Sequence, residues 1–306
     1  MIRPPIALFV FNRLVHTIHT IEALQKNHGA RESTLYIYSD GPRSDADAEG
    51  VAEVRSYVKA VTGFADVILV ERERNLGLAC SLISGIDEVL DAHESIIVLE
   101  DDLITSPHFL QFMYDALRCY EHEEQVVAIH GYSFPLGIPL PDTFFVRYTG
   151  CWGWGTWRRG WDLFETDGKK LLEQLQRLQI TKSFDKNGSY PFTRMLEDQV
   201  SGKVDSWAIR WHAATFLKNK LTLYPGVSMV KNIGHDGSGV HCGKSTFYDV
   251  GLTDEGVNVY PIPVREDMRV AGSLEAYNRR GHSGVVRYCL WKLFGKWVRV
   301  RGRNCQ

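Results

Sequence analysis

The chain has 306 residues, of which 44% are hydrophobic and 24% charged. These are ordinary globular values and exclude a disordered, collagen-like or coiled-coil chain. The formal net charge of −2 comes from 35 Lys and Arg against 37 Asp and Glu. The charge is unevenly distributed, because residues 279–306 hold eight basic side chains and no acidic one, which leaves residues 1–278 with a net charge of −10. An acidic body repels phosphate, so nucleic acid is not expected as a partner.

The six cysteines are scattered, with no C-x-x-C pair and no zinc-type spacing. In a chain of this size that pattern favours a reduced compartment. The apolar run after Pro5 has six residues, which is too short for the core of a signal peptide, and no run approaches the ~18–20 residues of a membrane-spanning helix. We therefore expect a cytoplasmic protein.

Apolar runs and helical patterns alternate over the first 120 residues. The runs predict strands at Ile6–Phe11, Leu35–Tyr38, Val67–Val70 and Ile96–Leu99. Helical periodicity predicts helices at Thr17–Gln25, Asp45–Val61, Leu78–Ala92 and Pro107–Tyr120. This alternation indicates an α/β fold with a parallel sheet and helices on both faces. Ligands of such sheets bind at the carboxyl ends of the strands.

The second part of the chain is less regular. Strands are expected at Val126–His130, Phe144–Arg147 and Leu221–Tyr224, helices at Lys169–Leu178 and Asp205–Leu217, and loops at Ser183–Tyr190 and Lys231–Ser245. No linker separates the two parts. We therefore expect a nucleotide-sugar-binding subdomain at 1–130, an acceptor and donor-sugar subdomain at 131–270, and a basic aromatic tail at 271–306.

Three consecutive acids, Glu100, Asp101 and Asp102, follow the fourth apolar run. A hard cation such as Mg²⁺ or Mn²⁺ takes one or two carboxylates and completes its coordination with phosphate oxygens and water. Because side chains alternate along a strand, Glu100 and Asp102 can face one site together. The plain alternative is a solvated turn that caps the helix that follows.

The Glu-Asp-Asp sequence, followed by an apolar residue and a Ser-Pro-x-Phe helix start, resembles the DxD-type metal motif of GT-A glycosyltransferases. Within that class it resembles N-acetylglucosaminyltransferase I and its bacterial relatives. Three further segments resemble the nucleotide-contacting segments of that family, in the same order: Phe9–Arg13, Tyr38–Gly41 and Arg72–Leu78. The resemblance covers roughly residues 5–245.

The resemblance implies a GT-A fold, in which a Rossmann-like mixed sheet is flanked by helices and joined to an acceptor subdomain. It also implies an inverting, metal-dependent hexosyl or N-acetylhexosaminyl transfer. The donor would be a nucleoside diphosphate sugar, a UDP-sugar above all, and the acceptor a saccharide or a lipid-linked sugar in bacterial surface-polysaccharide assembly.

By position, the resemblance implies that Asp102 is the principal metal ligand. It implies that Glu100 and Asp101 contact the ribose and the groups that surround the metal ligands. Asp40 would accept from the uracil N–H, and Arg13 would pair with the base or a phosphate. The other residues that would line the nucleotide pocket are Phe11, Asn12, Asn75 and Gly77. A late histidine would complete the Mn²⁺ or Mg²⁺ site, His241 first and His235 second. Plain alternatives are a surface arginine at position 13 and an ordinary turn around Asp40.

Four tryptophans stand within ten residues: Trp152, Trp154, Trp157 and Trp161. Indole rings can stack on the C–H faces of sugars, and a buried indole needs a partner for its N–H. Gly153-Trp154-Gly155 resembles the turn at the donor-sugar site of the family, which makes Trp154 a candidate sugar contact. The alternative is an aromatic core under a loop.

An inverting transfer needs one carboxylate that takes the proton of the acceptor hydroxyl. Asp205 precedes a predicted helix and is the favoured base, although an N-cap would also explain an acid there. Asp198, in Leu196-Glu-Asp-Gln199, is the second candidate.

Residues 285–303 mix Trp291, Phe294 and Trp297 with Arg and Lys, a pattern typical of contact with an anionic membrane surface. The alternative is a terminal helix packed on the body. The alternative functions are a sugar nucleotidyltransferase and a non-catalytic carbohydrate-binding protein. A sugar nucleotidyltransferase needs a Gly-rich phosphate loop after its first strand, where this chain has Asn12-Arg13-Leu14. A non-catalytic carbohydrate-binding protein has no need of three acids at a strand end.

Overall fold

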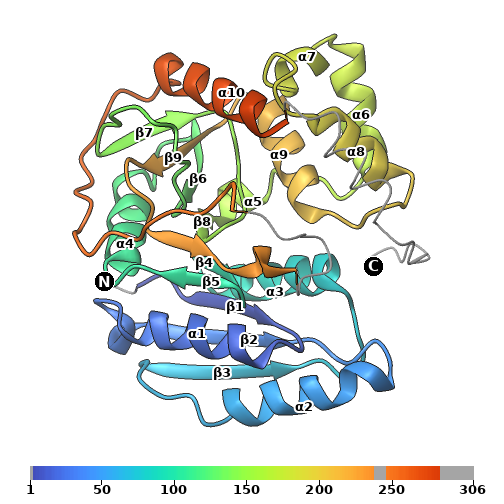
Figure 1. Cartoon of the computed structure of the whole chain (residues 1–306), viewed down its shortest axis with the longest axis vertical. Coiled ribbons are helices and arrows are strands. Elements are labelled where there is room, and N and C mark those ends of the chain that lie inside the picture. The colour runs from blue at the N-terminus through green and yellow to red at the C-terminus, as the bar shows by residue number, and fades with distance from the viewer. Residues whose placement is uncertain (1–2, 238–245, 283–306) are drawn as a thin grey trace.

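An eight-stranded sheet runs through this computed structural model, which describes residues 3–237 and 246–282 (Figure 1). Its strands lie side by side in the order β3 (Asp66–Glu71), β2 (Thr34–Ser39), β1 (Ile6–Val10), β4 (Ser95–Glu100), β8 (Trp154–Trp157), β6 (Val126–His130), β9 (Leu221–Pro225) and β7 (Thr143–Val146). A separate antiparallel pair joins β5 (Leu103–Thr105) to β10 (Val230–Asn232). The α/β class and the four N-terminal strands predicted from the sequence are confirmed.

Ten α-helices accompany the sheet in the described residues. They are α1 (Leu14–Gln25), α2 (Asp45–Val58), α3 (Leu78–Ala92), α4 (Phe109–Cys119), α5 (Arg158–Trp161), α6 (Gly168–Arg177), α7 (Thr181–Phe184), α8 (Phe192–Val200), α9 (Trp207–Leu217) and α10 (Met268–His282). Two short 3₁₀ helices lie at Ala30–Glu32 and Gly234–Asp236. The sequence patterns do not predict helices α5, α7, α8 and α10 or strands β5, β8 and β10. Most of these elements are only three or four residues long, and parts of α7 and β10 fall in the loops expected at 183–190 and 231–245.

Strands β1 to β4 are parallel, whereas the other half of the sheet mixes directions. The chain moves outward from β1 to β2 and β3, and then returns to the other side of β1 to form β4. The sheet therefore has a topological switch point between β1 and β4. In open α/β sheets ligands bind in the crevice beyond the carboxyl ends of the strands at such a point.

Side chains alternate across the sheet and fill two core layers. Ile6, Leu8 and Val10 of β1 face a layer that includes apolar residues of α1, α2 and α4. Ala7 and Phe9 face the opposite layer, with apolar residues of α3, α5 and α9. Because β1 is buried on both faces, it reads as a continuous apolar run, as expected of a central parallel strand.

Helices α6 to α9 gather on one side of the molecule (Figure 1). Their inward faces form a core of their own, which includes Leu171, Phe184, Leu196 and Phe216. Helix α9 joins this group to the sheet, because Trp207 and Trp211 pack in the layer of α3 and β4. This group supplies both aspartates predicted as bases, Asp198 on α8 and Asp205 before α9.

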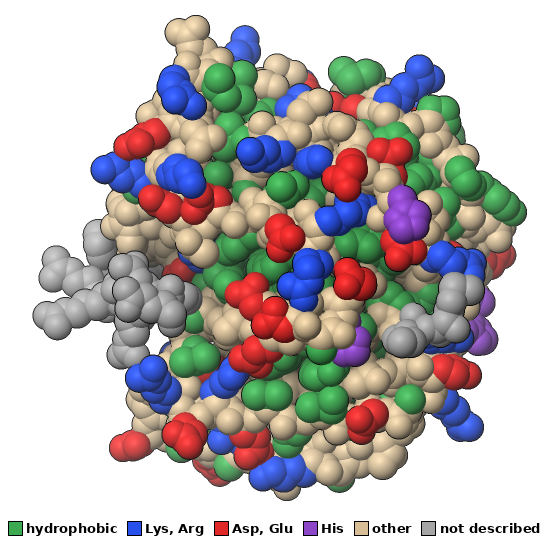
Figure 2. Space-filling model, turned by 180° about the vertical axis from the view of Figure 1, so that it is seen from behind, with side chains coloured by type: hydrophobic (Ala, Val, Ile, Leu, Met, Phe, Trp, Pro, Cys, Tyr) green, Lys and Arg blue, Asp and Glu red, His purple; other side chains and the backbone are tan. Residues whose placement is uncertain are grey.

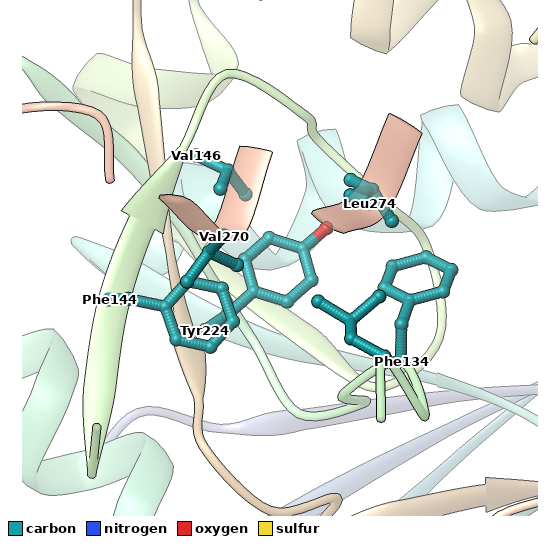
Figure 3. Close-up of a pocket in the computed structure, with 7 residues that line it drawn as sticks. Phe134, Phe144, Val146, Tyr224, Val270 and Leu274 are labelled. Atoms are coloured by element: carbon teal, nitrogen blue, oxygen red, sulfur yellow. The ribbon is translucent and has the colours of Figure 1, made fainter. Parts of the chain in front are cut away.

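A third apolar layer lies where α10 covers β7 and β9. A gap of about 10 Å³ lies there among Phe134, Phe144, Tyr224 and Leu274, and Figure 3 shows the phenol of Tyr224 pointing toward α10. That volume holds at most about one water, and a dry apolar lining offers it no partners. We interpret the gap as a packing defect and not as a ligand site.

Helix α10 crosses the expected boundary between residues 270 and 271, where the tail was predicted to start. The tail residues predicted to meet a membrane, including Trp291, Phe294 and Trp297, lie outside the described residues, and the three-part division of the chain stays a prediction. None of the helices in the described ranges is both long enough and apolar enough to cross a membrane.

Candidate active site

The carboxyl ends of four parallel strands meet at one edge of the sheet. The register pairs Val10 with Ser39, Ser39 with Glu71, and Phe9 with Glu100. The residues that follow these strand ends, 11–13, 40–41, 72–77 and 101–102, therefore lie along the same edge. Most of the nucleotide-site residues predicted from the sequence belong to these four segments, and the structure brings them together.

Arg13 fills the crevice between β1 and β4. Its guanidinium donates to both carboxylate oxygens of Asp101 and, at 2.9 Å, to Asp102 Oδ2. Burial by itself lowers the pKa of Arg13, but the adjacent Asp101 and Asp102 outweigh it and raise that pKa. Burial raises the pKa of Asp101, and Arg13 only partly offsets this. In this state an arginine is the cation that balances the two aspartates.

Glu100 is the least compensated of the three acids. Burial, and then the negative charges of Asp102 and Asp101, raise its pKa well above the usual range. Its carboxylate accepts no hydrogen bond from the described residues. Glu100 is only partly buried, and its raised pKa favours the neutral acid unless a further positive charge lies beside it.

The segment after β10 covers the acidic residues. The backbone N–H of Ile233 donates to the carbonyl of Asp102 at 2.8 Å. Gly234 passes so close that a Cβ there would lie 2.1 Å from Asp102 Oδ2. On the other side, His16 Nε2 lies 3.2 Å from Asp236 Oδ2. His16 was missed from the sequence, although its position three residues after Arg13 at the start of a helix places both on one face.

The side chains at this edge are of the types that bind a hard divalent cation. Glu100 and Asp102 offer carboxylate oxygens, and His235 has a buried Nε2 with no hydrogen-bond partner among the described residues. Burial lowers the pKa of His235 and favours the neutral imidazole that metals bind. Within the described ranges, however, no three Asp, Glu, His or Cys side chains converge on a common metal position. The predicted ligand His241 lies outside those ranges.

Asp40 has a different role from the predicted contact with uracil. Its Oδ1 accepts from the backbone N–H of Gly41 and Leu76, and its Oδ2 accepts from the N–H of Gly77 and from Asn75 Nδ2, each at 2.9 Å. A carboxylate has about four lone-pair sites, so none remains for a base. Asp40 instead shapes the loop at 75–77 that precedes α3. Asn75 and Gly77 stay predicted pocket residues, although the Asn75 side-chain amide and the Gly77 backbone N–H both donate to Asp40.

Phe11 and Asn12 are held from the start of α2. The Arg43 guanidinium lies over the Phe11 ring, 5.0 Å from its centroid. Asn12 donates to Asp47 Oδ1 at 2.7 Å, and Arg43 pairs with the same carboxylate at 3.0 Å. The side chains beyond β1 are thus fixed by the neighbouring loop, and their role toward a nucleotide stays a prediction.

The prediction that Trp154 contacts the donor sugar is corrected by its burial. Its side chain is 0% exposed, because β8 lies between β4 and β6 in the interior of the sheet. The indole stacks on Trp207 at 5.6 Å and contacts Trp161 and Trp211. The alternative given above, an aromatic core, is therefore correct for Trp154.

This core nevertheless positions the predicted base. Trp154 pairs with Val98 of β4 and stacks on Trp207 in the first turn of α9, so these rings join the start of α9, two residues after Asp205, to the sheet beside β4. The N-cap of α9 is Ser206, whose Oγ accepts from the N–H of Ile209 at 3.4 Å. The carboxylate of Asp205 is therefore not used as a cap. It is 53% exposed, with Arg210 at 3.4 Å.

Asp198 is placed differently. Its side chain is 5% exposed, and its Oδ1 lies 2.9 Å from Lys203 Nζ and 3.3 Å from Arg194. Two cations and burial leave this carboxylate little freedom to receive a proton from a substrate.

His130 is a buried histidine at the end of β6, and its protonation is expected to change the stability of the protein. Its Nδ1 contacts the carbonyl of Tyr132 at 2.9 Å, and its Nε2 accepts from the backbone N–H of Trp152 at 3.3 Å. A second proton on Nε2 would face that N–H. Burial lowers the pKa of His130 from 6.5 to about 4.

We expect acid to destabilise the protein through His130. Between pH 6.5 and 4 the unfolded chain binds more protons at this residue than the folded chain, so its stabilising effect is present above 6.5 and is lost as the pH falls toward 4. The loss from pH 7 to pH 5 is about 2 kcal/mol. Urea unfolding of the wild type and of His130→Gln gives the free energy of unfolding of each protein at pH 7 and at pH 5. The wild type should lose more of this free energy between the two pH values than the variant, and the difference measures the contribution of His130. An equal loss of unfolding free energy in the two proteins would show that His130 does not titrate in this way.

Two hollows in the described part of the chain, the gap under α10 and a groove beside α4, are lined by residues other than the three carboxylates. The groove has a volume of about 570 Å³ and is lined by His108, Asp115 and residues 256–260. The crevice between β1 and β4 is not open in the same way, because Arg13 occupies it. Acidic and basic side chains are intermixed over the face seen in Figure 2, as expected where surface charges pair with neighbours of opposite sign.

No family model matches the chain, and no curated protein matches it significantly. Among solved structures, it is similar to the mannosyltransferase PcManGT from Pyrobaculum calidifontis, in complex with GDP-Man and Mn²⁺, with a TM-score of 0.40 and 14% identity over 70% of this chain and 74% of that one. It is also similar to a candidate nucleotide-diphospho-sugar transferase from Desulfovibrio desulfuricans, with a TM-score of 0.35 and 15% identity over 54% and 69% of the chains. A third structure is residues 1–349 of S. aureus TarS, with a TM-score of 0.34 and 13% identity over 52% and 48%. Likenesses this distant do not establish a shared activity.

Proposed function

We propose that the protein is a metal-dependent, inverting glycosyltransferase that moves a hexosyl or N-acetylhexosaminyl group from a nucleoside diphosphate sugar. The donor is a UDP-sugar, and the acceptor is a saccharide or a lipid-linked sugar. One observation carries the proposal: three carboxylates, one of them uncompensated, stand at the switch point of an open α/β sheet. A dinucleotide or nucleotide diphosphate binds at such crevices in other α/β proteins, and the acids require a cation to accompany it.

The carboxylates would serve the donor through a cation. Glu100 and Asp102 would hold Mn²⁺ or Mg²⁺, with His235 beside Asp102 and His241 in the segment outside the description. When bound, the cation supplies positive charge to the diphosphate as it leaves. Arg13 already contacts Asp102. A cation on that carboxylate would free the guanidinium to donate to a phosphate oxygen, a geometry that suits arginine.

Asp205 would be the general base. Its carboxylate takes the proton of the acceptor hydroxyl while that oxygen attacks the anomeric carbon and the bond to the diphosphate breaks. The leaving diphosphate keeps the bonding electron pair. This assignment is supported by the exposure of Asp205 and by the stack of Trp207, at the start of α9, on Trp154 of the sheet. For a lipid-linked acceptor, the basic aromatic tail would contact an anionic membrane surface from the cytoplasmic side.

Isothermal titration of UDP into the protein, with and without Mn²⁺, tests the proposal. We expect binding that depends on the metal, because the acids cannot accept a diphosphate without it. Hydrolysis of a panel of sugar nucleotides in Mn²⁺ then identifies the donor. If no nucleoside diphosphate binds in either condition, the protein is not a transferase of this kind.

A further inference from the structure

One tryptophan differs from the others in the described ranges. Trp154, Trp157, Trp161, Trp207 and Trp211 are all buried. Trp152 is only partly buried. Its indole N–H has no acceptor among the described residues and is not sealed from solvent, whereas the N–H groups of Trp154 and Trp211 are buried without a partner. Of the four tryptophans in the 152–161 segment, only Trp152 is thus able to present an indole to a ligand.

The ring of Trp152 is held in a fixed orientation. Tyr132, Tyr248 and His235 contact it at 4.9, 5.3 and 5.4 Å between ring centroids, with interplanar angles of 88°, 83° and 73°. Its backbone N–H donates to the buried His130. A side chain ordered before binding loses less entropy when a ligand stacks on it. We define Trp152, His235 and Tyr248 as the aromatic wall.

The aromatic wall is continuous with the carboxylates. His235 follows Gly234, which passes against the Asp102 carboxylate, and the charge of Asp102 acts on His235. The ring of His235 in turn stacks on Tyr248 at 5.3 Å, with an interplanar angle of 30°. A group attached to a diphosphate held at Asp102 would therefore emerge beside these rings.

We propose that the aromatic wall binds a pyranose ring, with Trp152 as the stacking surface that selects for it. This inference rests on the proposed function. A sugar presents an apolar C–H face and hydroxyl edges, and an amphipathic aromatic such as Trp, with its ring and its free N–H, matches both. The ring belongs to the donor sugar or to the acceptor, and the experiment has an arm for each.

The donor arm compares UDP with hexose nucleotides in Mn²⁺ by isothermal titration, using UDP-glucose, UDP-galactose, UDP-N-acetylglucosamine and GDP-mannose. Trp152→Leu keeps apolar volume without an aromatic face, and Trp152→Phe keeps a ring. Trp152→Leu should bind UDP like the wild type and the preferred hexose nucleotide about tenfold more weakly, which corresponds to about 1.4 kcal/mol. Trp152→Phe should retain most of the affinity. Tyr260→Ala removes an exposed aromatic elsewhere and should change nothing.

The acceptor arm needs no nucleotide. Saturation-transfer NMR detects binding of methyl glucoside, methyl galactoside and methyl N-acetylglucosaminide to the protein. If a glycoside gives a saturation-transfer signal that is lost in Trp152→Leu and kept in Trp152→Phe, the pyranose bound at the aromatic wall belongs to an acceptor, which supports the inference. Unchanged binding in both arms for Trp152→Leu overturns it, as does a wild type that recognises no hexose in either arm. Absence of UDP binding with a Trp152-dependent glycoside signal would instead reject the proposed function and leave the aromatic wall established.

Discussion

Asp102→Asn is expected to remove metal-dependent nucleotide binding. Asn keeps the shape of the side chain, but a neutral amide is a much weaker ligand for a hard cation than a carboxylate. Asp102 lies at the point where β4 ends, the segment 233–236 crosses, and Arg13 donates at 2.9 Å. We expect the Kd of UDP in Mn²⁺ to rise at least about 100-fold and transfer to fall below detection. Isothermal titration and a donor-hydrolysis assay measure the two effects.

Two variants serve as controls for this result. Asp91→Asn changes an aspartate that is 80% exposed at the end of α3 and should leave nucleotide binding intact. Asp101→Asn removes the main ion pair of a buried arginine, so its principal effect should be on the free energy of unfolding. Wild-type UDP affinity in Asp102→Asn, still dependent on Mn²⁺, would place the metal elsewhere.

The half of the fold that carries this site follows from local patterns. Each of the first four strands is a short apolar run, and each of the first four helices has apolar residues at helical spacing, so both can be read along the chain. Parallel strands joined by helices then place their carboxyl ends at one edge. That reasoning predicts that Asn12, Arg13, Asp40 and residues 100–102 lie near one crevice, whereas Phe11, Asn75 and Gly77 are predicted there from the family resemblance alone.

The contacts of individual side chains could not be read in this way. Asp40 is saturated because the loop at 74–77 folds back onto the turn after β2, so closely that a Cβ on Gly41 would lie 2.5 Å from the Arg74 backbone. Trp154 is buried because β8 lies between β4 and β6, strands that are far from it in the sequence. Both outcomes depend on long-range pairing, which residue spacing does not encode.

Asp205→Asn is expected to stop transfer without loss of the donor. The amide cannot take the proton of the acceptor hydroxyl, and general-base catalysis contributes typically ~10²–10⁴-fold to a rate. We therefore expect kcat to fall about 10³-fold while the affinity for UDP in Mn²⁺ stays within about twofold of the wild type. Because Ser206, and not Asp205, caps α9, the variant should also unfold at nearly the same urea concentration.

The comparison with Asp198→Asn decides between the two candidate bases. The buried carboxylate of Asp198 pairs with Lys203 and Arg194, so loss of its charge removes both ion pairs and should lower stability more than turnover. A reduced kcat in Asp205→Asn with intact binding, beside a less stable but active Asp198→Asn, supports Asp205. The reverse pattern is an active Asp205→Asn and a folded but inactive Asp198→Asn. It would assign the proton transfer to Asp198, whose ion pairs would then have to open when the acceptor binds.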